Sequence, residues 1–99
     1  MSQAGIILCV DDDSTVLAAL RSVLSSHFGS EMECEFAESG DEALEIDAEL
    51  RAQGRALGLV ISDFMMPGLR GDELLVRLHS TSPNTVKILL TGQSDLTGV

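Results

Sequence analysis

The sequence contains no tryptophan, no tyrosine and only three phenylalanines among its 99 residues. A hydrophobic core must therefore be aliphatic, and the hydrophobic content of 44% is ample to build one. No apolar run reaches the roughly 18 residues of a membrane-spanning helix, and no charged start followed by a long apolar stretch indicates a signal peptide. We expect a single small cytoplasmic domain.

Basic residues are also scarce. Six lysines and arginines stand against sixteen aspartates and glutamates, which gives a formal net charge of −10. Nucleic acids and anionic membranes are bound by clustered lysine and arginine, so this composition argues against both as direct partners. A cation or a basic protein surface suits the charge better. The two cysteines lie in apolar or alternating segments, which indicates reduced thiols in the core.

Apolar segments with the length of strands recur along the chain. Residues 5–10, 57–62 and 85–90 are mostly apolar, as in parallel strands that are covered on both faces. Residues 32–37 instead alternate between apolar and acidic side chains, so one face of this strand is solvated. Such a strand is expected at the edge of the sheet.

Three segments with helical periodicity separate these strands. The first has Asp13 or Ser14 as its N-cap and Gly29 beyond its end. The second opens with a capping box at residues 39–42, and the third has Asp72 as its predicted cap. The alternation of strands and helices predicts a doubly wound α/β fold, in which a parallel sheet carries helices on both faces. Ligands of such folds bind beyond the carboxyl ends of the strands.

Acidic side chains follow two of the predicted strands. Asp11 and Asp12 come after the first strand and Asp63 comes after the third, while the hydroxyl of Thr91 ends the fourth. If these strands are neighbours in the sheet, the groups meet in one cleft. Clustered carboxylates repel one another unless a cation is bound, and Mg²⁺ prefers such oxygen ligands. The chemistry that this cleft assembles is phosphoryl transfer to a carboxylate.

Three segments carry a resemblance to a known family. ILCVDDDSTVLAAL, LVISDFMMPGLRGDELL and KILLTG resemble, in register from about residue 6 to residue 92, the receiver domain of bacterial two-component response regulators. The resemblance implies a flavodoxin-like sheet with the strand order 2-1-3-4. It also implies that residues 1–99 form one receiver domain, a signalling module that is not an enzyme beyond self-phosphorylation and autodephosphorylation.

The resemblance implies a role for each residue of the cleft. Asp63 is the phosphoacceptor, which takes a phosphoryl group from the phosphohistidine of a sensor histidine kinase or a phosphotransfer protein. Asp11 and Asp12 hold Mg²⁺ with it, and the backbone carbonyl of Met65 completes the protein ligands. Once Asp63 is modified, the Thr91 hydroxyl donates a hydrogen bond to a phosphoryl oxygen.

The family pattern continues beyond Thr91 with a fourth helix, a fifth strand that ends in a Lys-Pro pair, and a fifth helix. The single lysine of this chain, Lys87, lies inside the predicted fourth strand instead. We therefore expect a receiver domain that is incomplete at its C-terminus, followed in the full-length protein by an output domain. Without a fifth strand, the fourth becomes an edge, and we expect a homodimer through this strand and the tail of residues 92–99.

Two alternative functions stay open at this point. DDDSTV also fits the Asp-x-Asp-x-Thr signature of haloacid-dehalogenase-type phosphatases, with Asp11 as nucleophile and Asp13 as general acid and base. That fold normally needs a longer chain, and it gives no reason for the Asp-Phe-Met-Met-Pro-Gly loop. The absent C-terminal lysine favours the other alternative, an interaction module that keeps the fold without phosphorylation.

Overall fold

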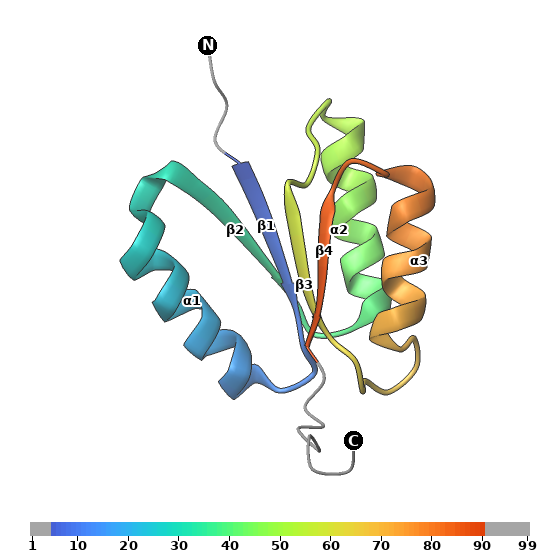
Figure 1. Ribbon diagram of the computed structural model, residues 1–99, viewed down its shortest axis with the longest axis horizontal. Helices are drawn as coiled ribbons and strands as arrows, with labels where there is room; N and C mark the ends of the chain where they lie inside the picture. The colour runs from blue at the N-terminus through green and yellow to red at the C-terminus, as the bar shows by residue number, and fades with distance from the viewer. Residues whose placement is uncertain (1–4, 91–99) are drawn as a thin grey trace.

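The computed structural model describes residues 5–90, which form a four-stranded parallel sheet (Figure 1). In chain order, the strands are β1 (Gly5–Val10), β2 (Met32–Ala37), β3 (Leu59–Asp63) and β4 (Val86–Leu90). They lie in the order β2-β1-β3-β4, and each neighbouring pair is parallel. The predicted strand order is confirmed, and so is the edge position of the alternating strand β2.

Helices cover both faces of the sheet. The helical segments are α1 (Ser14–Phe28), α2 (Gly40–Ala52), α3 (Gly71–Thr81) and a short 3-10 turn, η1 (Gly29–Glu31). In Figure 1, α1 lies on one side of the sheet and α2 and α3 lie together on the other. This confirms the doubly wound architecture. Among residues 5–90, no helix is both long and apolar enough to cross a membrane.

Each face of the sheet has its own aliphatic core, because successive side chains of a strand point to opposite faces. On β1, Ile6 and Leu8 are buried on the side of α2 and α3, where Leu74 and Leu78 of α3 join them. Ile7 and Cys9 are buried on the side of α1. Burying a side chain of this size stabilises a fold by about 1.5–3 kcal/mol. The sheet is thus held from both sides, which leaves its carboxyl edge free to display polar groups.

Two helix caps predicted from the sequence are present. Asp13 is the N-cap of α1, where its carboxylate accepts the amide hydrogen of Thr15 at 2.9 Å. Ser39 is the N-cap of α2, and its hydroxyl accepts the amide hydrogen of Glu42 at 3.1 Å. Gly29 follows α1 with a φ of 55°, a left-handed conformation that favours glycine. These caps fix where each helix starts or ends relative to the sheet.

The predicted cap of the third helix is wrong. Arg70, with extended backbone angles, is the N-cap residue, and its side chain makes no capping hydrogen bond. Asp72 lies in the first turn, where its carboxylate forms an ion pair with Arg70 at 2.7 Å. An acid in the first turn is favoured by the partial positive charge of the helix N-terminus, so Asp72 stabilises α3 without capping it.

A buried acid ties α2 to the end of α3. Asp47 is only 1% exposed, although helical periodicity gives no reason to expect an acid there. Its carboxylate accepts hydrogen bonds from Nε of Arg51 at 3.0 Å and from the hydroxyl of Thr81 at 3.4 Å. A buried carboxylate is costly unless it is paired in this way, so these contacts make Asp47 compatible with the core.

Candidate metal and phosphoryl site

The carboxyl ends of β1 and β3 bring three aspartates together. Asp11 and Asp12 directly follow β1, and Asp63 is the last residue of β3. The two strands are neighbours, with Val10 opposite Ser62 in the register. As a result, carboxylate oxygens of the three aspartates lie within 4.8 Å of one another. The predicted convergence of these acids is therefore present in the structure.

Asp11 is the most buried acid of this cluster, at 7% exposure. Burial raises the pKa of its carboxyl above the usual value, and the charges of Asp63 and Asp12 raise it further. A hydrogen bond from the amide of Asp13 to Oδ1 of Asp11, at 2.8 Å, opposes this shift. Carboxylate oxygens so close together match the hard ligands that Mg²⁺ prefers, so this donor set fits a magnesium ion.

The other two predicted site residues, Met65 and Thr91, are not members of the aspartate cluster. Met65 lies in the loop that follows β3 at the same edge of the sheet, and its side chain is 65% exposed. The neighbouring Met66 is buried in the core on the side of α2 and α3. Thr91 and the tail of residues 92–99 lie outside the described residues. The described part of the site is therefore the acid cluster with the exposed Met65 beside it in the chain.

Asp13 does not join the cluster. Its carboxylate caps α1, and its amide group donates a hydrogen bond to the carboxylate of Asp11. The phosphatase alternative needs Asp13 beside Asp11 as a free general acid, whereas the structure gives its side chain a structural partner. The structure thus groups Asp63, rather than Asp13, with the carboxylates of Asp11 and Asp12.

Two residues that contact the backbone of Asp63, Ser62 and Gly71, have no role assigned from the sequence, although Gly71 belongs to the segment that resembles the receiver family. The buried hydroxyl of Ser62 donates a hydrogen bond to the carbonyl of Asp63 at 2.9 Å. Gly71, the first residue of α3, packs directly against the same carbonyl. The only sequence signal for either is the second glycine that follows the Pro-Gly loop.

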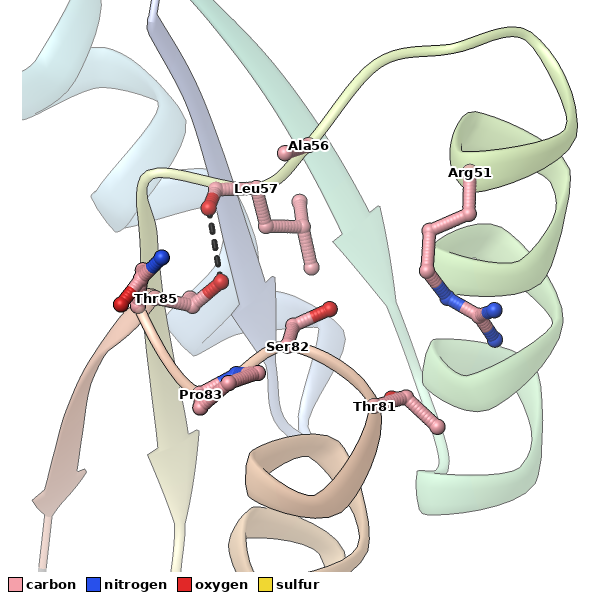
Figure 2. Close-up of a pocket in the computed structure, with 8 residues that line it drawn as sticks. Arg51, Ala56, Leu57, Thr81, Ser82, Pro83 and Thr85 are labelled. Carbon is pink, nitrogen blue, oxygen red and sulfur yellow. Dashed lines mark hydrogen bonds between the residues drawn. The ribbon is translucent and has the colours of Figure 1, made fainter.

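A pocket of about 260 Å³ lies at the opposite end of the strands (Figure 2). It is formed by the loops that lead into β3 and β4, and Arg51, Thr81, Ser82 and Pro83 are among its lining residues. The hydroxyl of Thr85 spans these loops by donating to the carbonyl of Leu57 at 2.7 Å (Figure 2). Its lining includes none of Asp11, Asp12 and Asp63, so the pocket is separate from the aspartate cluster.

Comparison with known proteins assigns this chain and its fold to one class of signalling domain. A family model described as the response regulator receiver domain matches residues 7–99. The chain belongs to the response regulator receiver domain family.

Individual relatives match the chain over nearly its whole length. The DNA-binding transcriptional regulator NtrC of Escherichia coli (strain K12) is 34% identical over 94 residues, which are 95% of this chain and 18% of the relative. The sensor kinase CckA of Brucella abortus (strain 2308) is 33% identical over 92 residues, which are 93% of this chain and 9% of the relative. This chain thus spans less than a fifth of these two relatives, and it matches one module of much longer proteins.

A solved structure confirms the fold. The signal receiver domain of an HD domain-containing protein from Pseudomonas fluorescens Pf-5 superposes with a TM-score of 0.78 at 34% identity. The match covers 96% of this chain and 70% of that one. The relationship therefore extends from sequence to three-dimensional structure.

Proposed function

We propose that this chain is the phosphoacceptor module of a two-component system, and that it takes a phosphoryl group onto Asp63 from a sensor histidine kinase or a phosphotransfer protein. The observation that carries the proposal is the position of Asp63 within 4.8 Å of Asp11 and Asp12 at the carboxyl edge of the sheet. Membership of the receiver family supports it. In this role the chain is a signalling domain that changes state, and it has no separate substrate to turn over.

In the proposed reaction, a carboxylate oxygen of Asp63 attacks the phosphorus of a phosphohistidine. The new oxygen–phosphorus bond forms as the phosphorus–nitrogen bond breaks, and the imidazole nitrogen keeps the electron pair and takes up a proton. Asp11 and Asp12 hold Mg²⁺ together with Asp63 and the backbone carbonyl of Met65. When bound, Mg²⁺ neutralises negative charge that would otherwise repel the phosphoryl group. The Thr91 hydroxyl then donates a hydrogen bond to a phosphoryl oxygen.

Mass spectrometry after incubation with acetyl phosphate and Mg²⁺ tests this proposal. We expect one phosphoryl adduct, located on Asp63 by peptide fragmentation, and no adduct on an Asp63→Asn variant. An adduct on Asp11 would instead identify the phosphatase chemistry. A wild-type chain that acquires no adduct would identify an interaction module that works without phosphorylation.

We also propose that residues 1–99 are the receiver portion of a longer cytoplasmic protein with an output domain C-terminal to it. The support is that the chain spans only 18% of NtrC and 70% of the Pseudomonas fluorescens receiver structure. Mass measurement of the natural protein tests this directly. A natural product with the mass of the 99-residue chain would contradict it.

The 99-residue chain itself has a surface suited to a second copy. Along β4, Val86, Ile88 and Leu90 are between 40% and 59% exposed. The intervening Lys87 points to the other face, where its ammonium donates to the carbonyl of Ser82 at 2.9 Å. The only charge on the strand therefore does not protect the apolar face, and among the described residues β4 has a neighbouring strand on one side only.

We propose that two copies pair through β4, and through the tail that follows it, into one continuous sheet. An antiparallel pair centred on Ile88 places Val86 opposite Leu90 of the second copy, with all of these side chains on the same face. Sedimentation velocity at micromolar concentration should show a dimer. Ile88→Lys should give a monomer, whereas Val76→Lys, at a 71% exposed site on α3, should leave the dimer intact. A monomeric wild type, or a dimeric Ile88→Lys, would refute this interface.

A further inference from the structure

The peptide group that follows Asp63 is held by two residues that the proposed mechanism does not use. The hydroxyl of Ser62, a fully buried residue, donates to the carbonyl oxygen of Asp63 at 2.9 Å. On the other side, a Cβ atom added to Gly71 would lie 2.0 Å from that oxygen and 2.9 Å from the carbonyl carbon. The first residue of α3 therefore touches the backbone of Asp63 so closely that only glycine fits.

The flanking backbone is fixed to two other elements. The amide of Phe64 donates to the carbonyl of Leu90 in β4 at 2.9 Å, and the carbonyl of Phe64 accepts the amide hydrogen of Gly71 at 3.0 Å. The chain directions on both sides of Asp63 are thus set by β4 and by the start of α3. Since the backbone determines the direction of the Cα–Cβ bond, these contacts also set the direction in which the side chain of Asp63 leaves the backbone.

We propose that Gly71 and Ser62 are positioning residues for the phosphoacceptor: they fix the carbonyl of Asp63 and so hold its carboxylate beside Asp11 and Asp12. This inference rests on the proposed function and deepens it. Gly71 is needed for its small size rather than for backbone freedom, because its φ is not among the positive ones. Cβ atoms essentially never approach non-bonded atoms of residues beyond their chain neighbours closer than 3.0 Å. Alanine at this position must therefore displace the carbonyl by about 1 Å, and such a displacement at a reacting group can lower a rate about 100-fold.

The experiment compares wild-type protein with Gly71→Ala and Ser62→Ala in the full 99-residue chain. Two quantities are measured at a temperature where circular dichroism shows each variant to be folded: the rate of phosphorylation by acetyl phosphate, and the Mg²⁺ dissociation constant from calorimetric titration. We expect Gly71→Ala to lower the phosphorylation rate at least about tenfold and also to raise the Mg²⁺ dissociation constant. Ser62→Ala keeps the packing of α3 and removes one hydrogen bond, so we expect a smaller loss of a few-fold in both quantities.

Two matched controls separate positioning from general stability. Gly58→Ala places a Cβ 3.5 Å from the carbonyl of Ile6, an ordinary contact. Thr85→Val removes a buried hydroxyl that donates to the carbonyl of Leu57 at 2.7 Å, at the opposite end of the sheet. Both variants should keep the wild-type rate and Mg²⁺ affinity, and Thr85→Val should do so although its melting temperature falls. A purely structural role predicts instead that rate follows melting temperature in all variants.

The outcomes distinguish this inference from the proposed function. If wild-type protein is phosphorylated and both Gly71→Ala and Ser62→Ala match it in rate and Mg²⁺ affinity, the positioning role is refuted and the proposed function stands. If wild-type protein binds Mg²⁺ without taking up a phosphoryl group, the proposed function is refuted, and the Mg²⁺ affinities of the variants still decide the positioning role. If wild-type protein neither binds Mg²⁺ nor takes up a phosphoryl group, both the proposed function and the positioning role are refuted. Should Gly71→Ala fail to fold, Ser62→Ala alone decides the question.

Discussion

Asp11 is a buried carboxylate that faces two other negative charges, so its ionised form is destabilised in the folded protein. Asp11→Asn removes this charge and keeps an oxygen that can accept the amide hydrogen of Asp13. In metal-free buffer at pH 7, we expect the variant to have a higher free energy of unfolding than wild type. Denaturant unfolding in the presence of a chelator measures this difference.

The pH dependence of that difference has a definite sign. The pKa of Asp11 is raised in the folded state, so the folded protein binds this proton more tightly than the unfolded chain does. The wild type therefore gains stability from this group as the pH falls through the raised pKa, and loses it as the pH rises. We expect the advantage of Asp11→Asn to be largest at neutral pH and to shrink in acid. A variant that is less stable than wild type at pH 7 would contradict this account.

Asp12 differs from Asp11 because it is exposed, so we expect it to contribute mainly to Mg²⁺ binding. Mg²⁺ that binds only the folded state stabilises it by an amount that grows with the logarithm of the Mg²⁺ concentration relative to the dissociation constant, and so raises the melting temperature. We expect Asp12→Asn to lose most of this effect, whereas Glu45→Gln, at an exposed acid of α2 outside the cluster, should retain it. Thermal unfolding with and without Mg²⁺ is the measurement. Equal stabilisation of Asp12→Asn and wild type would show that the metal binds elsewhere.

Which residues could be predicted depends on how they act. Asp11, Asp12 and Asp63 are found from the sequence because each follows an apolar strand, and parallel strands place such residues at a common edge. Ser62 and Gly71 act through the carbonyl of Asp63, a group that every residue has and that no side-chain pattern reveals. Contacts with the backbone become visible only in the folded structure.

At the scale of single elements, the start of α2 offers a clean test. The hydroxyl of Ser39 satisfies the amide of Glu42, and the carboxylate of Glu42 in turn accepts the amide hydrogen of Glu38 at 2.8 Å. Ser39→Ala leaves the amide of Glu42 without this partner and should lower the free energy of unfolding by about 1 kcal/mol. Urea denaturation measures it, with Ser26→Ala on the exposed surface of α1 as the control. A loss of equal size in both variants would argue against the capping role.

The helix starts also show where sequence reasoning succeeds and fails. Ser39 was a predictable cap because it begins a capping box, whereas at α1 the sequence left Asp13 and Ser14 as alternatives and the structure shows Asp13 as the cap. At α3 the segment Arg70-Gly71-Asp72 offers competing signals, and Asp72 has the residue type of a cap. The helix nevertheless begins at Gly71, which packs against β3, and Asp72 pairs with Arg70 instead. With Asp72 as its cap, α3 would begin two residues later. Packing of Gly71 against β3 therefore outweighs the local preference of Asp72 for the cap position.

For the whole molecule, the net charge of −10 implies repulsion among surface acids. Raising sodium chloride shortens the screening length from about 30 Å at 0.01 M to about 8 Å at 0.15 M. We expect the melting temperature to rise by a few degrees over this range. In a domain of this size, a gain of about 1 kcal/mol in the free energy of unfolding raises the melting temperature by roughly 4–8 °C. Mg²⁺ at matched ionic strength should raise it further, because it also binds the cluster. Equal effects of the two salts would mean that Mg²⁺ acts only by screening.

The parallel arrangement of all described strand pairs has a consequence for how the site comes into existence. A parallel pair cannot close as a hairpin, so each pairing must wait for an intervening helix and a long crossover. Non-local pairing of this kind slows folding. Asp11 follows β1 and Asp63 ends β3, and these two strands pair although they lie far apart in the sequence, with Ile7 opposite Leu59. Nascent or partly unfolded chains therefore lack the aspartate cluster, and under the proposed function the onset of Mg²⁺ binding reports the moment when β1 and β3 dock.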